Sequence, residues 1–376
     1  MTRSIAFLVA SAAVIAGCSA SSDDSAFPGS SNAGERAADS SGGSSGGSAS
    51  TPPGTGSSSG GMSAEEGGDG TSDPGQPGSQ TQAGQLTAGV WDDNLNFDFF
   101  SKYAEAAESS LLGLPAFSAS ERIGARAKFV QRSAKTQLDV AVLFDTTGSM
   151  GDELAYLKAE MDGIASSVAE KFPGATARYA LVLYRDEGDE YLTRKFDFTT
   201  SLDEFQSHLA AQAANGGGDY PEAVPAGVAE LNALSWRTDA NVARIGFWIA
   251  DAPAHTYKSS QLKTAIETSV QKDVHLYPVA ASGTDERAEY TMRASAQMTG
   301  GRYIFLTDDS GIGGAHAEPH IPCYVVTRFD RALVRMAESE MTGKHVFAPA
   351  GEILRTVGNP VDGTCTTKSS GNVVLY

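Results

Sequence analysis

Two patterns of apolar residues alternate along the second half of the chain. Short runs with few polar positions predict buried β-strands, and these runs occupy residues 138–144, 180–184, 245–249, 276–280 and 303–306. Between the runs, apolar residues recur every three or four positions, as at Leu154, Leu157 and Met161, which predicts amphipathic helices. Strands that alternate with helices indicate a doubly wound α/β fold, with a mostly parallel sheet and helices on both faces. Residues 191–199 alternate and are partly charged, so we expect them to form one antiparallel edge strand.

Three polar loops accompany this sheet: residues 145–149 and 251–255 follow predicted strands, and residues 215–222 follow a helix predicted at about 202–212. In open α/β sheets, ligands bind at the carboxyl ends of the strands. We therefore expect the three loops to meet in space and to form one site. Pro221 suits the first turn of the helix that follows the second loop, because the N–H group that proline lacks would be unpaired there anyway.

The first loop has the composition of a metal site. Asp145, Thr147 and Ser149 stand at alternate positions, which can direct one carboxylate and two hydroxyl groups toward a common point. Gly148 permits the tight backbone path between them. A site made of oxygen atoms with few carboxylates suits hard divalent cations, with Mg²⁺ expected first and Ca²⁺ or Mn²⁺ as alternatives. Asp251, at the end of another predicted strand, can add a second carboxylate, directly or through water.

The run Asp-Thr-Thr-Gly-Ser at residues 145–149 resembles the Asp-x-Ser/Thr-x-Ser element of the von Willebrand factor type A domain, which forms a metal-ion-dependent adhesion site. The strand order and the second and third loops match as well, so the resemblance covers about 138–310. It implies that Thr147 and Ser149 contact the metal directly, while the two aspartates act largely through water. It also implies one open coordination position that accepts an acidic side chain of a protein partner.

The second loop departs from the family pattern. The family commonly places a threonine ligand there, but residues 218–222 contain none. Asp219 is the expected substitute, and capping of the following helix is its alternative role. An additional carboxylate would favour tolerance of Ca²⁺ or Mn²⁺. His255 in the third loop could contact a bound ligand or make a hydrogen bond that holds the loop.

The first 82 residues carry export signals and no apolar core. Residues 1–18 combine a positive charge with an apolar run that is too short to span a bilayer and suits a signal peptide. The run ends in Ile-Ala-Gly-Cys, which resembles the lipobox of bacterial lipoproteins, so Cys18 is the expected lipid anchor. Ser19 after the cysteine implies, by the same resemblance, the outer membrane of a bacterial envelope. Residues 19–82 are rich in Ser and Gly and predict a disordered tether.

Charge and cysteine content narrow the class of protein further. The net charge is −18; residues 1–18 hold one arginine and residues 19–82 hold eight acids and one arginine, so −12 falls on residues 83–376. Nucleic-acid binding needs basic patches, so an acidic chain argues against it. With Cys18 assigned to lipid, Cys323 and Cys365 remain as an even pair, and we predict a disulfide in an oxidising compartment.

Two other polar groups have less specific interpretations. Asp92, Asn94, Asn96 and Asp98 alternate like the start of a calcium loop, but Phe97 stands where such a loop needs glycine. We interpret these four residues as solvated polar positions between aromatic ones. His316, Glu318, His320 and Cys323 could suggest zinc, but Pro319 prevents helical spacing of the two histidines.

These observations predict a membrane-anchored, metal-dependent protein-binding module that is not an enzyme. Residues 83–137 form an N-terminal extension, and residues 311–376 form a C-terminal extension packed on the domain of residues 138–310. A structural scaffold of an envelope assembly is an alternative function. A metal-assisted hydrolase with His255 as a base is a further alternative, but the chain shows no Ser-His-Asp order, catalytic cysteine or paired-metal ligand set.

Overall fold

The computed structural model describes residues 84–110, 117–129 and 132–376. The expected signal peptide, the lipidation site Cys18 and the tether at residues 19–82 lie outside these ranges. Within the described ranges, no helix combines the length and the apolar character that a membrane span requires.

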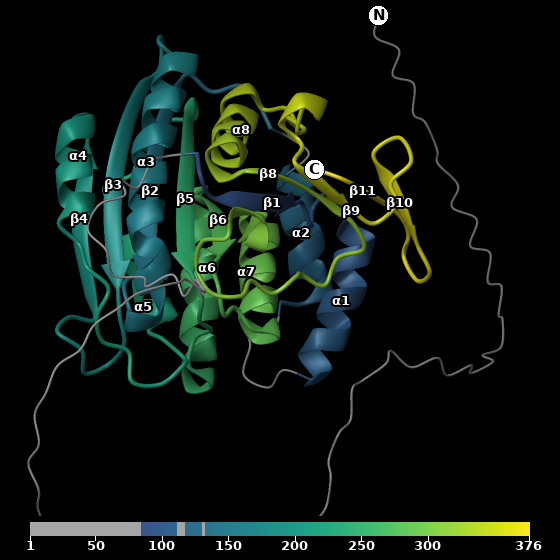
Figure 1. The fold of residues 1–376 in the computed structure, drawn as a ribbon, viewed down its shortest axis with the longest axis horizontal. Helices are drawn as coiled ribbons and strands as arrows, with labels where there is room; N and C mark the ends of the chain where they lie inside the picture. The colour runs from purple at the N-terminus through teal and green to yellow at the C-terminus, as the bar shows by residue number, and fades with distance from the viewer. Residues whose placement is uncertain (1–83, 111–116, 130–131) are drawn as a thin grey trace, which may run out of the picture. The chain divides into compact units, whose positions relative to one another are not determined.

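A nine-stranded sheet forms the centre of the fold, in the order β4-β3-β2-β5-β6-β7-β1-β8-β9 (Figure 1). Strands β3, β2, β5, β6 and β7 are parallel to one another, and β4 at the edge is antiparallel to β3. The predicted doubly wound α/β fold is thereby confirmed. The nine strands are β1 (Thr87–Trp91), β2 (Gln137–Asp145), β3 (Thr176–Tyr184), β4 (Thr193–Thr199), β5 (Val242–Ala250), β6 (His275–Ala280), β7 (Tyr303–Leu306), β8 (Tyr324–Arg328) and β9 (Arg355–Val357).

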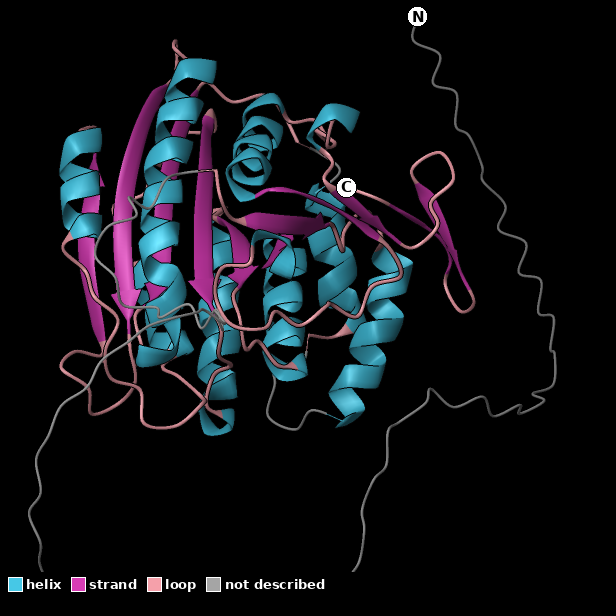
Figure 2. Cartoon of the chain, viewed as in Figure 1, coloured by secondary structure: helices cyan, strands magenta, loops and turns pink. Residues whose placement is uncertain are grey.

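Helices cover both faces of this sheet (Figure 2). One face packs against α3 (Gly151–Lys171), α4 (Leu202–Ala210) and α8 (Phe329–Thr342). The other face packs against α1 (Phe97–Ser110), α2 (Ala119–Phe129), α5 (Val224–Asn232), α6 (Ser259–Lys272) and α7 (Glu286–Thr299). Every residue of β5 is buried because this strand is covered on both sides, which explains its continuous apolar sequence.

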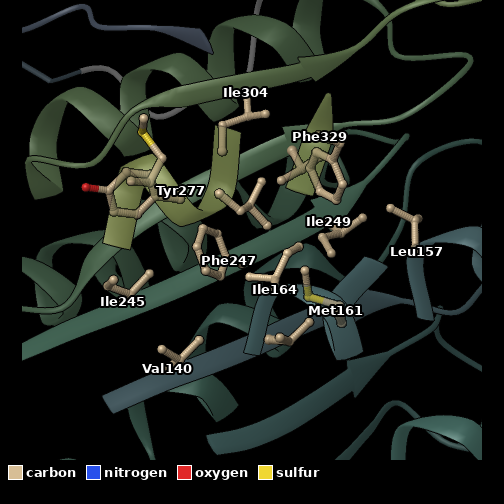
Figure 3. Packing of buried hydrophobic residues seen from close by; sticks show 14 of the residues in the cluster. Val140, Leu157, Met161, Ile164, Ile245, Phe247, Ile249, Tyr277, Ile304 and Phe329 are labelled. Carbon is tan, nitrogen blue, oxygen red and sulfur yellow. The ribbon is translucent and has the colours of Figure 1, made fainter. Parts of the chain in front are cut away.

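Alternation along the strands divides the core into two layers. Successive side chains of a strand point to opposite faces, so β5 sends Phe247 toward α3 and Trp248 toward the other helices. Figure 3 shows the layer on the α3 side, where side chains from β2, β5, β6 and β7 meet those of two helices; it includes Val140, Leu157, Met161, Ile164, Ile245, Phe247, Ile249, Tyr277, Ile304 and Phe329.

The sheet extends beyond the strands that the sequence pattern identified. Strand β1 lies between β7 and β8 and is antiparallel to both, and β9 pairs with β8. Glu160 of α3 holds the start of β1, because its carboxylate accepts hydrogen bonds from the N–H groups of Gly84, Gln85 and Leu86 at 2.8–3.0 Å. The N-terminal extension therefore contributes β1, an internal strand of the sheet that lies between β7 and β8.

The interpretation of Asp92, Asn94 and Asn96 as solvated residues is wrong. All three are buried, with 5% exposure or less. Asp92 accepts a hydrogen bond from Nε of Arg302 at 2.8 Å and also accepts one from the N–H group of Asn94. These residues lie in the connection between β1 and α1, which other elements of the fold cover. Their polar atoms are therefore removed from water and require partners within the protein.

The predicted disulfide between Cys323 and Cys365 is present. It joins the residue before β8 to a separate two-stranded hairpin, formed by β10 (Thr364–Thr367) and β11 (Gly371–Val374). Because the sulfur of Cys323 is in this bond, it is not available to the alternative zinc group. His320 of that group instead places Nδ1 2.7 Å from a carboxylate oxygen of Glu289.

Candidate metal centre

The three loops expected to converge are hydrogen-bonded to one another. The N–H group of Gly148 in the first loop donates to the carbonyl of Gly216 in the second at 3.0 Å. The N–H group of Asn215 donates back to the carbonyl of Thr146, also at 3.0 Å. The second loop reaches the third through the N–H group of Glu222, which donates to the carbonyl of Pro253 at 2.9 Å. These backbone contacts bring the predicted ligand loops to one place.

The first loop is held in shape by its own aspartate. Oδ1 of Asp145, the last residue of β2, accepts from the N–H group of Thr147 at 3.0 Å and from its hydroxyl at 2.7 Å. The hydroxyl oxygens of Thr147 and Ser149 are 3.4 Å apart. Gly148 favours this close approach, because a Cβ atom there would make a tight contact of 3.0 Å with the carbonyl oxygen of Gly216. The loop thus presents two neighbouring hydroxyl groups beside a buried carboxylate.

Three carboxylates around this hydroxyl pair each have a buried oxygen without a hydrogen-bond partner among the described residues. The atoms are Oδ2 of Asp145, Oδ1 of Asp251 and Oε2 of Glu222. The three residues are at most 4% exposed. Buried anionic oxygens without donors cost free energy unless a cation or donor satisfies them. The donor set of carboxylate and hydroxyl oxygens fits a hard divalent cation.

The pKa values of these three acids are all raised, as expected for buried carboxyl groups that no nearby positive charge among the described residues stabilises. Burial, reinforced by the charge of Asp251, raises the pKa of Asp145 to about 7. Burial also raises the pKa of Glu222 to about 9, and the charge of Asp145 adds to this effect. Burial raises the pKa of Asp251 despite an opposing hydrogen bond from Ser149. A dication at this place would offset these penalties and favour the ionised carboxylates.

Four of the five predicted metal ligands gather at this point, and the fifth lies apart. Asp145, Thr147, Ser149 and Asp251 are connected by the contacts described above. Asp219 is exposed, and its carboxylate belongs to a different group of side chains, which contains Asp186 and His255.

Glu222 was not among the predicted site residues, although it lies beside the first loop. A Cβ atom on Gly217 would be 3.0 Å from Oε1 of Glu222 and 3.2 Å from Cβ of Thr147, so both side chains border the same glycine. The expectation that Pro221 lies in the first turn of a helix is wrong: α5 begins at Val224. The available signal was the presence of a second acid at the end of the 215–222 loop.

Comparisons with known proteins identify the family of the central domain. Residues 139–311 match the family model of the von Willebrand factor A domain, which confirms the predicted resemblance. An ariadne-like RING finger protein of Acanthamoeba polyphaga mimivirus is 26% identical over 188 residues, which are 45% of this chain and 18% of that protein. The alpha-protein kinase vwkA of Dictyostelium discoideum is 28% identical over 119 residues, 31% of this chain and 19% of the kinase. The chain therefore spans less than a fifth of the length of either relative.

Two bacterial structures are also similar. The pilus adhesin SpaC of Lactobacillus rhamnosus GG aligns with a TM-score of 0.39 at 9% identity, over 56% of this chain and 31% of the adhesin. The BatB protein of Bacteroides thetaiotaomicron aligns with a TM-score of 0.32 at 12% identity, over 45% of this chain and 89% of BatB.

Proposed function

Residues 139–311 form a von Willebrand factor A domain, and we propose that this domain binds a protein partner through a divalent cation held by the loops around Asp145. The observation that carries the proposal is the set of three buried carboxylate oxygens beside the Thr147–Ser149 hydroxyl pair, for which the described part of the chain supplies no hydrogen-bond partner. Domains of this family often bind a divalent cation. Mg²⁺ is the first candidate, with Ca²⁺ and Mn²⁺ as alternatives.

Each side chain has a distinct part in this site. Thr147 and Ser149 offer neutral oxygens that coordinate a cation directly. Asp145 orients the Thr147 hydroxyl through the 2.7 Å hydrogen bond, and it supplies negative charge together with Asp251 and Glu222. A bound dication provides positive charge and a coordination position that a partner's carboxylate can occupy. Because two of the nearest oxygens belong to hydroxyl groups, the cation keeps enough positive charge to attract that carboxylate.

We also propose that the domain is displayed from a bacterial outer membrane by the lipid on Cys18 and the tether at residues 19–82. Support comes from the order of positive charge, apolar run and lipobox-like sequence at residues 1–18. Labelling with a fatty-acid analogue, lost in Cys18→Ala, tests this part. Retention of the label in Cys18→Ala would refute it, without bearing on the metal site.

Partner capture tests the main proposal. The full chain is immobilised and exposed to envelope extracts with Mg²⁺, with Ca²⁺ or with EDTA, and Asp145→Ala is compared with the unchanged protein. The proposal expects capture that requires the metal and is lost in Asp145→Ala. Asp203→Ala is the matched control, because Asp203 is an exposed acid in the first turn of α4. Capture that survives both EDTA and Asp145→Ala would contradict the proposal.

The same variants distinguish the alternative functions. A scaffold whose metal only connects loops would lose stability in EDTA, with no change in the proteins captured. A metal-assisted hydrolase would show turnover in a broad substrate screen, and that turnover would disappear in Asp145→Ala. We propose a binding module because the side chains around Asp145 offer carboxylate and hydroxyl oxygens, which lower the pKa of a metal-bound water less than the histidine ligands of a catalytic zinc do.

A further inference from the structure

A second group of metal-ligating side chains lies next to the first loops. Asp186, Asp219 and His255 each offer one ligand atom, and these three atoms lie within 4.8 Å of one another. Asp186 follows β3, Asp219 belongs to the loop before α5, and His255 follows β5. Ligands from three loops at one edge of the sheet can surround an ion, and here one of them is a nitrogen.

In this group, the side chains of Asp186 and His255 are buried and that of Asp219 is exposed. Nε2 of His255 lies 2.8 Å from Oδ1 of Asp186, and the two side chains are 10% and 8% exposed. Asp219 is exposed and faces solvent. The backbone around Asp186 is held in place, because its N–H group and that of Gly217 both donate to Oδ2 of Asp189, at 3.0 and 2.9 Å. An ion could therefore enter past Asp219 and meet two side chains that are already in position.

Glu222, which borders the first loop, also lies next to this second group. The residue is 3% exposed, and its Oε2 atom has no hydrogen-bond partner among the described residues. Its backbone forms a β-bridge with Ala254, the neighbour of His255, so it lies alongside this group. Glu222 thus borders Thr147 of the first loop with its side chain and pairs through its backbone with the neighbour of His255.

We propose that Asp186, Asp219 and His255 form a second cation site, which takes a transition-metal dication of the Zn²⁺ type. Imidazole nitrogen suits Zn²⁺, whereas Mg²⁺, Ca²⁺ and Mn²⁺ prefer oxygen ligands. Ligand atoms around a zinc ion at about 2.0–2.2 Å stand roughly 3.3–3.5 Å apart, which small side-chain rotations can reach from the present separations. Binding replaces the His255–Asp186 hydrogen bond with two metal–ligand bonds and leaves neutral imidazole on the ion. This site is distinct from the proposed protein-binding site and would stand if that proposal failed.

Zinc titration of the full chain tests this inference. Isothermal titration with Zn²⁺ is performed in excess Mg²⁺, so that the hard-cation site is saturated. The expected result is one zinc ion per chain, with affinity at least tenfold weaker in His255→Gln. His208→Gln is the matched control, because His208 also lies near a carboxylate, 3.8 Å from Glu204, but belongs to α4 and not to this group. Equal zinc affinity in the unchanged protein and His255→Gln would overturn the inference.

Two further variants separate a lost ligand from a misfolded protein and from the first site. Asp219→Asn removes an exposed carboxylate, so it should weaken zinc binding while circular dichroism and the melting temperature stay unchanged. Asp145→Asn should weaken Mg²⁺ binding and preserve zinc binding. If Asp145→Asn abolishes zinc binding as strongly as His255→Gln in a folded protein, the two groups are one site and the inference fails.

Discussion

Nε2 of His316 lies 2.9 Å from Oε1 of Glu153, although the two residues are 163 positions apart. Nδ1 of the same ring lies 2.8 Å from Oδ1 of Asp308. Glu153 is in the first turn of α3, directly after the first metal loop, whereas His316 is in the connection between β7 and β8. Glu153 also accepts a hydrogen bond from the N–H group of Ser282 at 3.0 Å. A single imidazole thus joins this long connection to the helix that follows the metal loop.

This contact predicts a pH-dependent contribution of His316 to stability. Burial alone would lower the pKa of His316, but the hydrogen bonds to Glu153 and Asp308 outweigh it and raise the pKa above its ordinary value. A raised histidine pKa stabilises the folded state fully below about pH 6.5, and this contribution is lost as pH rises through the folded value. His316→Gln should therefore lower the melting temperature at about pH 6 much more than at about pH 9. Thermal unfolding across this range checks the prediction, with His208→Gln in α4 as the control. An equal loss of melting temperature at both ends of the range would contradict the assignment.

The cluster around Asp145 also predicts that stability falls as pH rises when metal is removed, because its carboxyl groups hold their protons in the folded protein. The folded protein holds a proton on Asp145 up to about pH 7, whereas the unfolded chain releases it near pH 3.9. In EDTA, stability should therefore fall as pH rises from about 4 to 7, and the raised pKa of Glu222, about 9, extends the fall. Mg²⁺ at about 100 times its dissociation constant should restore roughly 2.7 kcal/mol at pH 8.

Urea unfolding with EDTA and with Mg²⁺, at several pH values, measures both effects. Asp145→Asn should show a shallower fall with pH in EDTA and a smaller gain from Mg²⁺. Asp203→Asn, an exposed acid in α4, should behave like the unchanged protein. If EDTA leaves the unchanged protein no more sensitive to pH than Asp145→Asn, the carboxylate cluster does not carry the repulsion described here.

The first loop could be predicted from sequence, whereas Glu222 could not. The alternation of Asp145, Thr147 and Ser149 is a local property, and one strand followed by one helix suffices to place it. Pro221 fits a helix start by local rules, yet the chain remains extended because Glu222 bridges to Ala254 in another loop. Periodicity along one segment does not reveal this pairing, so the acid that borders Thr147 was not among the predicted ligands.

The same reason explains why the half of the sheet around β1 was not predicted. Strand β1 is short, and its partners β7 and β8 lie more than 200 residues later, as in the pairing of Ala88 with Leu306. The burial of Asp92 likewise depends on Arg302, 210 positions away. Buried charges look like solvated ones in a sequence until the partner is identified. By contrast, β2 and β5 were predictable because burial on both faces leaves a continuous apolar run.

The buried ion pair between Asp93 and Arg293 predicts a large loss of stability on removal of the acid. Two guanidinium nitrogens of Arg293 lie 2.8 and 2.9 Å from the two oxygens of Asp93, and both side chains are at most 1% exposed. Asp93→Ala leaves a buried arginine with Glu289 as its remaining carboxylate partner in this cluster. Breaking such a pair costs about 3 kcal/mol or more. Urea denaturation measures the loss, and Glu190→Ala, which removes an exposed acid paired with Arg194, should cost less than about 1 kcal/mol.

The disulfide predicts a stability effect that leaves the metal centre unchanged. Cys323 and Cys365 are 42 positions apart, and closing a loop of this length stabilises the fold by about 4 kcal/mol in the chain-entropy model. The bond fastens the β10–β11 hairpin, whose buried Val373 precedes the buried terminal residue Tyr376. Strand β8 is separated from β5, which carries a metal loop, by β6, β7 and β1. Reduction should therefore lower the free energy of unfolding by up to about 4 kcal/mol while Mg²⁺ affinity stays the same.

Unfolding and Mg²⁺ titration with and without a phosphine reductant check this prediction. The double variant Cys323→Ala with Cys365→Ala should have the lower stability already and should not respond to reductant. Hydrogen exchange should locate the loosened amides in the hairpin and around Tyr376, whose hydroxyl lies 2.7 Å from that of Ser339 in α8. A parallel drop in Mg²⁺ affinity would mean that the hairpin and the metal loops are energetically coupled, contrary to the separation of their strands in the sheet.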